Sequence, residues 1–218
     1  MLKTGGDSMS IENRREREKE EMRELILSAA NEIVALEGFE KISIRKIANK
    51  IDYSPSIIYH YFTDKDEIIN ILMCAGYKKI VEAISSVNLD VGSPEDRLKK
   101  MTNNYIEAAL KMPDEFMAAH LSKSQQALKY TSSLFKGASK EKPALGSLCK
   151  CIKEINIDKE MDDSEVEILS QIISVSTLGL TIKLIEENDI GNEQRQKLIK
   201  YFSEEIVLKI VKVKINKN

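Results

Sequence analysis

The sequence has few of the residues that interrupt or cross-link a chain. Only four of its 218 residues are proline and nine are glycine, and tryptophan is absent. The three cysteines, Cys74, Cys149 and Cys151, make no even disulfide framework. Because unpaired cysteines are typical of reducing compartments, this composition favours a cytoplasmic protein.

A signal for export and a membrane span are also lacking. Residues 1–20 have no apolar core of the kind that a signal peptide requires, and we expect residues 1–11 to be a disordered leader. The longest uncharged run, residues 168–182, is too short to span a bilayer and contains serine, threonine and glutamine. The sequence therefore predicts no membrane partner.

The chain has no strong net charge of either sign. Its 33 lysines and arginines are balanced by 35 acidic residues, which gives a formal net charge of −2. A polycation is therefore excluded, and any contact with nucleic acid must come from a local patch. With 42% hydrophobic residues, the chain can bury one large core or two smaller ones.

What the sequence does have is helical periodicity, which predicts an all-α fold. Near the N-terminus, apolar residues recur at alternating steps of three and four. They are Met22, Leu25, Ile26, Ala29, Ala30, Ile33 and Val34. Gly38 stands where a left-handed C-cap would end this helix.

Residues 43–62 predict two short helices in succession. Ser43 is a good N-cap for the first helix, and Ser54 with Pro55 begins the second. Asp64 begins a third, longer helix. Two short helices joined by a four-residue turn, with a longer helix on each side, are typical of a helix-turn-helix module.

The second short helix predicts a face that reads DNA. At 100° per residue, Ile58 and Phe62 point into the module, whereas Ser56, Ile57 and His60 point away from it. Small polar groups can reach base edges in the major groove, and an aliphatic group can meet a thymine methyl. An ordinary exposed helix face is the alternative.

Contacts to the phosphates are expected from the flanks of this face and from the helix before it. Tyr59 and Tyr61 lie on the two flanks, although partial burial of Tyr61 is nearly as plausible as phosphate contact. In residues 41–62 four basic side chains stand against Asp52 alone, a local net charge of +3. The four are Lys41, Arg45, Lys46 and Lys50.

The stretch from about residue 25 to residue 72, roughly a fifth of the chain, resembles the DNA-binding domain of the TetR family of transcriptional regulators. The matching positions are Gly38 and Phe39 after the first helix, Ser43 opening the second, Ile47 and Ala48 inside it, Tyr59 and Phe62 closing the third, and Lys65 beginning the fourth. The resemblance implies that Arg45 reaches a base or phosphate and that Tyr59 and Lys65 hold phosphates. Asp52 departs from the family, which usually has glycine there, but aspartate tolerates the left-handed conformation with some strain.

The predicted organisation follows from these elements. It comprises a leader (1–11), a helix-turn-helix DNA-binding domain (12–64), a linking helix (65–87) and a larger helical ligand-binding and dimerisation domain (88–218). The candidate DNA-binding residues are Ser43, Arg45, Lys46, Ser54, Pro55, Ser56, Ile57, Tyr59, His60, Tyr61 and Lys65.

Beyond residue 88 the pattern predicts further helices. One begins at Ser93 and Pro94, Pro113 restarts the chain, and residues 131–146 are expected to form a loop before a helix near residues 148–155. Two long helices, at about 164–187 and 193–212, would close the chain, and the tail beyond them would be a fraying helix.

The last two helices predict a two-fold dimer. The first of them is apolar around almost its whole circumference, so a partner subunit's helices would have to cover it. The expected interface residues are Ile172, Val175, Leu178, Gly179, Ile182, Leu198, Phe202 and Ile206. The two-fold axis would place two reading helices about 34–36 Å apart on a near-palindromic operator.

A stripe rich in methionine and aromatic residues suggests a pocket for a small-molecule effector. It consists of Met101, Tyr105, Met112, Phe116, Met117 and His120. About half of it is expected to be core, but such residues also line adaptable apolar pockets. A mainly apolar ligand bound there would tilt the linking helix, change the spacing of the reading helices and release a repressor from DNA.

A helical enzyme and a co-regulator are the alternative functions. Cys149 and Cys151 with His120 lack the spacing of a metal site, and no Ser-His-Asp triad, phosphate loop or paired-carboxylate motif is present. We therefore expect neither an enzyme nor a cofactor. A helical enzyme would be dismissed if the C-terminal domain held no buried polar cluster. A co-regulator that binds a protein partner instead of DNA is disfavoured by Arg45, Tyr59 and Lys65, and a salt-dependent mobility shift would distinguish it.

Overall fold

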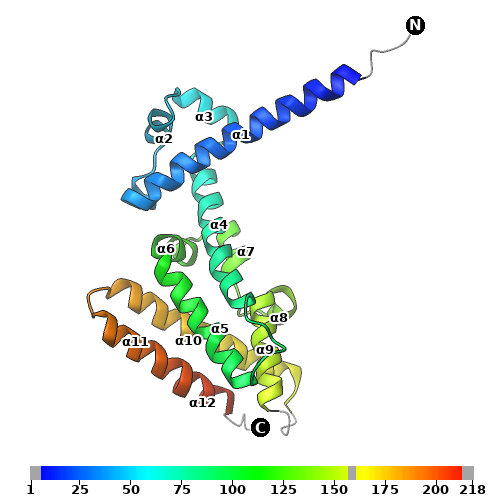
Figure 1. Cartoon of the computed structure of the whole chain (residues 1–218), viewed down its shortest axis with the longest axis vertical. Coiled ribbons are helices and arrows are strands. Elements are labelled where there is room, and N and C mark those ends of the chain that lie inside the picture. Colours follow the sequence, from blue (N-terminus) through cyan, green and yellow to red (C-terminus); the bar gives the residue numbers. More distant parts are fainter. Residues whose placement is uncertain (1–5, 157–160, 213–218) are drawn as a thin grey trace. The chain divides into compact units, whose positions relative to one another are not determined.

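The computed structural model describes the backbone of residues 6–156 and 161–212, and the side chains of residues 13–156 and 161–212. Every regular element in these ranges is helical, as the sequence predicts (Figure 1). The chain divides into two compact units, Met1–Met73 and Cys74–Asn218, and the division falls inside helix α4 (Lys65–Ser85).

The first unit holds the predicted helix-turn-helix. Its elements are α1 (Gly6–Glu37), a short 3-10 turn (Phe39–Lys41), α2 (Ile44–Lys50), α3 (Pro55–Tyr61) and the first part of α4. The expected leader over residues 1–11 is wrong from Gly6 onward, because α1 already begins there, and residues 1–5 lie outside the described part. No proline or glycine interrupts residues 7–37, and the (i, i+4) ion pairs Arg14–Glu18 and Arg17–Glu21 support the exposed helix.

The core of the first unit is assembled from all four helices. The predicted α1 stripe is buried from Ile26 to Val34, whereas Met22 at its beginning is half-buried and Leu25 is exposed. The core residues are Ile26, Ala29, Ala30, Ile33, Val34, Ile42, Ile44, Ile47, Ala48, Ile58, Phe62 and Ile68. Because Ile58 on α3 and Phe62 directly after it lie in this core, the opposite face of α3 is fixed toward solvent.

The predicted caps are only partly as expected. Ser43 Oγ accepts a hydrogen bond from Lys46 N at 3.2 Å, as an N-cap should. The Ser54 hydroxyl instead lies 2.7 Å from Ser56 Oγ and makes no cap to α3. Asp52, in the turn between α2 and α3, has a φ of 58°, the left-handed conformation that its position was expected to require.

The second unit contains the remaining helices. They are α5 (Pro94–Lys111), α6 (Pro113–Leu121), α7 (Gln125–Thr131), α8 (Ala138–Glu141), α9 (Pro143–Ile155), α10 (Asp163–Glu186), α11 (Asn192–Tyr201) and α12 (Val207–Lys212), with a π-helical turn at Phe202–Ile206 between the last two. The expected loop over residues 131–146 is partly wrong, because α8 and the start of α9 occupy it. Pro143 takes the first turn of α9, where a missing N–H costs nothing.

Helices α5, α9, α10 and α12 pack around the main core of the second unit. Its residues are Val87, Leu98, Met101, Ala138, Leu145, Leu148, Cys151, Ile152, Val166, Leu169, Ile173, Val207 and Val211. Gly76 lets α4 approach α6 closely, since a Cβ there would lie 2.5 Å from the Cβ of Glu115. The predicted tail helix reaches Lys212, and residues 213–218 lie outside the described part.

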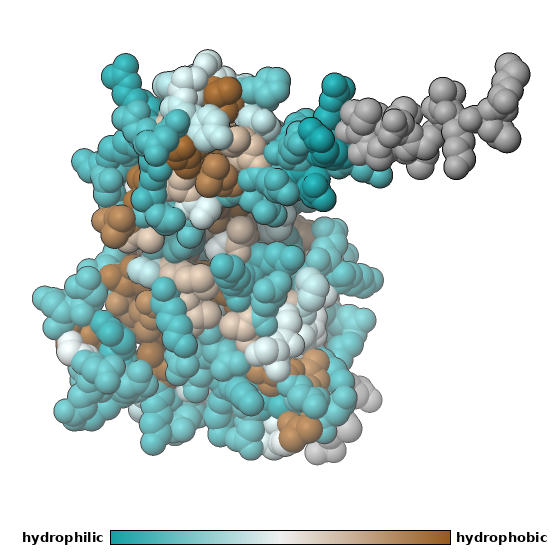
Figure 2. Space-filling view, turned by 45° about the horizontal axis from the view of Figure 1, so that its top comes forward, coloured by the Kyte–Doolittle hydropathy of each residue, from teal (hydrophilic) through white to brown (hydrophobic). Residues whose placement is uncertain are grey.

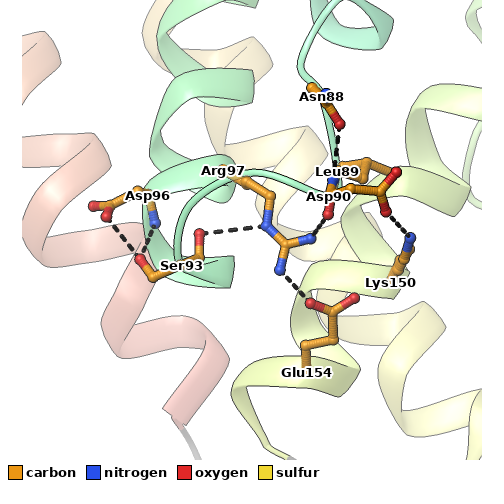
Figure 3. A network of polar contacts seen from close by, with 8 residues as sticks. All are labelled: Asn88, Leu89, Asp90, Ser93, Asp96, Arg97, Lys150 and Glu154. Atoms are coloured by element: carbon orange, nitrogen blue, oxygen red, sulfur yellow. Dashed lines mark hydrogen bonds and ion pairs between the residues drawn. The ribbon is translucent and has the colours of Figure 1, made fainter.

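A buried arginine joins the α4–α5 connection to α9 (Figure 3). Arg97 on α5 is 6% exposed, and its guanidinium donates to the carbonyl oxygens of Leu89 and Ser93 and to the carboxylate of Glu154 on α9. Lys150, also on α9, pairs with Asp90 at 3.6 Å. These contacts tie residues 88–93 to the core of the second unit.

Candidate nucleic-acid interface and C-terminal cavity

The outer face of α3 carries the side chains that the sequence assigned to it. Ser56, Tyr59 and His60 are exposed, and Ile57 is half-buried. Tyr61 is also half-buried and packs against the core of the first unit, which agrees with the burial alternative for this residue. The polar groups of α3 therefore form one accessible surface, with Tyr59 (57% exposed) at its edge.

Arg23 on α1 holds the C-terminal end of α3, and sequence reasoning missed it. Its guanidinium donates to the carbonyl oxygen of Tyr61, lies 4.3 Å from the ring centroid of Phe62 and is 3.8 Å from Glu67 on α4. Hydrogen bonds from Thr63 to the Glu67 carboxylate lower the pKa of that group, so it stays ionised beside Arg23. One cation thus fixes α3 between its two neighbouring long helices.

The positive charge of residues 41–62 is partly neutralised by acidic residues that lie outside this range in the sequence. Lys46 Nζ lies 2.5 Å from Glu37 Oε2, and Lys50 Nζ lies 2.8 Å from Glu32 Oε2, both on α1. Within residues 13–156 and 161–212, no ion pair is formed by Lys41, Arg45 or Lys65, and all three are exposed. Of the expected phosphate-binding cations, these three are therefore the ones without an acidic partner.

A cavity of about 360 Å³ lies in the second unit. Its apolar wall is formed by residues of α4, α9 and α10. Another side is formed by Tyr130 and Thr131 at the end of α7 and by Ser132 and Ser133 after it. The apolar lining residues are Val81, Ile84, Pro143, Ala144, Leu145, Leu148, Val175 and Leu178. Lysines and one glutamate, namely Lys78, Lys129, Lys142 and Glu141, also border it.

Tyr77, Tyr105 and His120 form a polar cluster on the wall of this cavity. Tyr105 Oη lies 3.4 Å from His120 Nε2, and the rings of Tyr77 and His120 meet edge to face at 5.2 Å. Burial lowers the pKa of His120 to about 4 and raises that of Tyr77 to about 12, and it raises the pKa of Tyr105 well above 10. All three groups are therefore uncharged near neutral pH and can offer hydrogen bonds inside an apolar space.

The predicted ligand stripe divides between cavity and core. Tyr105 and His120 line the cavity, and Met101 lines a smaller one of about 40 Å³ beside Tyr105. Phe116 is fully buried and packs against His120, with ring centroids 4.6 Å apart. Met112 and Met117 line neither of these two cavities, so their assignment as ligand contacts stays a prediction.

Comparison with known proteins agrees with this architecture. Residues 26–71 match the family model described as bacterial regulatory proteins, tetR family. The first unit therefore carries a TetR-family domain. Over 82 residues it is 29% identical to the HTH-type transcriptional regulator BetI of Stenotrophomonas maltophilia (strain R551-3). That match spans 37% of this chain and 42% of the length of that curated relative.

The TetR fold extends over most of the chain. A TetR/AcrR-family regulator of Thermobifida fusca YX-ER1 superposes with a TM-score of 0.62 at 15% identity, covering 90% of this chain and 100% of the other. The fatty acid degradation regulator FadR of Bacillus halodurans superposes with a TM-score of 0.60 at 18% identity, covering 85% and 93%. At these identities the likeness shows the fold alone.

Helix α10 has a buried and an exposed apolar side. Leu169, Ile173 and Leu184 are buried, whereas Ile172 (46%) and Val175 (44%) are exposed. By length and composition α10 could also cross a membrane, which is weak evidence in a helix whose inner side is part of a protein core. Figure 2 shows hydrophobic patches within a mostly hydrophilic surface on one face of the molecule.

The predicted interface residues differ in their exposure to solvent. Ile172, Val175, Gly179, Leu198 and Ile206 are exposed, Leu178, Ile182 and Phe202 are half-buried, and Leu178 also lines the cavity. Cys149 Sγ lies 3.3 Å from Ser170 Oγ, while His120 belongs to the aromatic cluster. Among the residues that the structure describes, no group of three or more histidine, cysteine, aspartate or glutamate side chains could hold a metal ion.

Proposed function

We propose that this protein is a cytoplasmic transcriptional regulator, acting as a repressor, that reads double-stranded DNA with the exposed face of α3. The observation that carries the proposal is that Ser56, Ile57 and His60 face outward while Ile58 and Phe62 anchor the same helix in the core. Arg45, Lys65 and Tyr59 surround this face and can contact phosphates. The test is selection of bound duplexes from a random pool, which should recover a near-palindromic site.

The regulator is proposed to act as a homodimer. The exposed apolar residues on α10 and on α11–α12 support this, since a lone chain leaves Ile172, Val175 and Leu198 in water. A Cβ placed on Gly179 would meet no atom of the chain within 4 Å, so this stretch of α10 can accept another helix closely. A two-fold dimer would present two α3 helices to two half-sites.

The cavity of the second unit is proposed to bind the effector, a mainly apolar small molecule. Its apolar wall would hold the body of the ligand, and the uncharged Tyr105–His120 pair would hydrogen-bond one polar group. Helix α4 runs from the core of the first unit, where Ile68 is buried, to the cavity, where Val81 and Ile84 line the wall. Ligand binding that shifts α4 would therefore change DNA affinity, and DNA would weaken ligand binding by the same factor.

The Tyr105→Ala variant is expected to bind an apolar probe about tenfold more weakly than wild type, because it loses an aromatic wall and a hydrogen-bonding group. The measurement is fluorescence titration with N-phenyl-1-naphthylamine, an uncharged dye. Met117→Ala is the matched control, because Met117 borders neither cavity, and it should bind the dye as wild type does.

DNA binding without ligand should stay nearly intact in the Tyr105→Ala variant. Dye affinity should also be constant between about pH 6 and pH 9, since neither His120 nor Tyr77 titrates there. Equal loss in the two variants, or no dye binding to wild type, would show that the cavity is not an effector site.

The structure and the DNA-binding test bear on the two alternative functions, an enzyme and a co-regulator. The absence of a buried polar cluster would have dismissed an enzyme, but the cluster of Tyr77, Tyr105 and His120 is present. Its groups are uncharged, and His120, with a pKa of about 4, is a weak base. A co-regulator that acts through a protein partner would not bind DNA. The duplex selection therefore also tests this alternative, because such a protein would enrich no sequence.

A further inference from the structure

Two glutamates of α1 lie opposite two lysines of α2. Glu37 Oε2 is 2.5 Å from Lys46 Nζ, and Glu32 Oε2 is 2.8 Å from Lys50 Nζ. The lysines are four residues apart and therefore share one face of α2. Both ion pairs connect different helices of the first unit, so they are set by the fold of the module rather than by helical spacing alone.

These ion pairs matter more for charge than for stability. The side chains are partly exposed, 43% and 44% in the first pair and 33% and 60% in the second, and such pairs contribute only about 0–1 kcal/mol to folding. They change the local charge substantially: the net charge of +3 over residues 41–62 falls to +1 once Glu32 and Glu37 are included.

We propose that Glu32 and Glu37 compete with DNA phosphates for Lys50 and Lys46, and so set the sequence-independent part of DNA affinity to a low value. The inference rests on the proposed DNA binding. A phosphate must displace a carboxylate from each lysine before it gains that contact, and the displaced carboxylate stays close enough to repel the DNA.

As a consequence, DNA affinity depends more strongly on the contacts that α3 makes with the bases. Phosphate contacts carry no sequence information, whereas base contacts of the kind proposed for Ser56, Ile57 and His60 on α3 do. A genome offers very many non-specific sites, so a weak electrostatic contribution keeps more protein free to find its operator. It also keeps operator affinity within the range that an effector can reverse with a coupling of about 1–3 kcal/mol.

The experiment measures DNA affinity of the full-length Glu32→Gln, Glu37→Gln and double variants by fluorescence anisotropy. Two duplexes of equal length are used, the selected site and a scrambled sequence. Each single variant should bind about threefold more tightly and the double variant about tenfold, by the same factor on both duplexes. The slope of log affinity against log salt should steepen by about 0.9 for each lysine released.

Glu40→Gln is the matched control. Glu40 is exposed on the turn between α1 and α2 and pairs with neither lysine, but its replacement changes the net charge equally. It should alter affinity by less than about twofold, since an isolated surface charge is screened by salt. Adding Lys46→Gln to Glu37→Gln should remove the gain.

Three results would overturn the inference. They are unchanged affinity and slope in the double variant, a gain in the Glu40→Gln control as large as that of the double variant, and a gain confined to the selected site. Circular dichroism should show that all variants are folded, because glutamine keeps the shape of glutamate and each pair adds little stability. Failure of wild type to bind either duplex would instead refute the DNA-binding proposal itself.

Discussion

A lysine in place of Ile172 is expected to leave the protein monomeric and to weaken binding to its DNA site at least about a hundredfold. Ile172 is 46% exposed on α10, so the substitution leaves the core of the second unit untouched. In the proposed dimer the same position is covered by a partner helix, where a lysine charge would lose its water without gaining a partner. Light scattering at micromolar concentration measures the mass, and fluorescence anisotropy measures the DNA affinity.

The large loss of affinity follows from the geometry of two half-sites. In a dimer, binding of the second reading helix is an intramolecular step. It raises the affinity above that of one helix by a factor of about 10²–10⁴. Val91→Lys is the matched control, because Val91 is 65% exposed on the connection between α4 and α5. It should remain dimeric with unchanged affinity, and an Ile172→Lys variant that did the same would rule out the α10 interface.

Replacing Arg97 by alanine is expected to lower the melting temperature by about 10 °C. The Arg97 side chain is 7% exposed, and its removal leaves the Glu154 carboxylate and the Leu89 carbonyl without their shared donor (Figure 3). Both acceptors belong to half-buried residues, so water only partly replaces the lost hydrogen bonds and part of the desolvation cost is left uncompensated. Thermal unfolding followed by circular dichroism gives the melting temperature.

Two further variants separate the fork geometry of Arg97 from its charge. Arg97→Lys keeps the charge but cannot reach three acceptors in one plane, so its melting temperature should lie between those of wild type and Arg97→Ala. Lys100→Ala, one turn further along α5 and exposed, should melt as wild type does. If Arg97→Ala melted no lower than Lys100→Ala, the network would have no stabilising role.

The first unit could be predicted in detail because local sequence determines it. Ser43 as an N-cap, the buried Ile47 and the left-handed Asp52 all act within a few residues of chain. Arg23 could not be found in this way, since the Tyr61 carbonyl oxygen that it binds lies 38 residues further along the chain. Its contact depends on how α1 packs against α3, which periodicity does not give.

The second unit was predicted less well for the same reason. Helical projection placed Met112 and Met117 on a common stripe with Tyr105, but it cannot say which neighbour each face meets. The cavity is formed by residues of α4, α9 and α10 together, and part of its wall comes from the stretch after α7 that was expected to be a loop. Its position is therefore a tertiary property.

The most direct test of the central claim is a selection of duplexes from a random pool by wild type, Tyr59→Ala and His60→Ala. Wild type should enrich a near-palindrome whose half-sites are one helical turn or a multiple apart. Tyr59→Ala should recover the same sequence with lower affinity, because phosphate contacts are the same on every sequence. His60→Ala should recover an altered sequence, with a loss of about 1–3 kcal/mol on the wild-type site. An altered sequence for Tyr59→Ala with an unaltered one for His60→Ala, or no enrichment by wild type, would contradict the assignment of α3 as the reading helix.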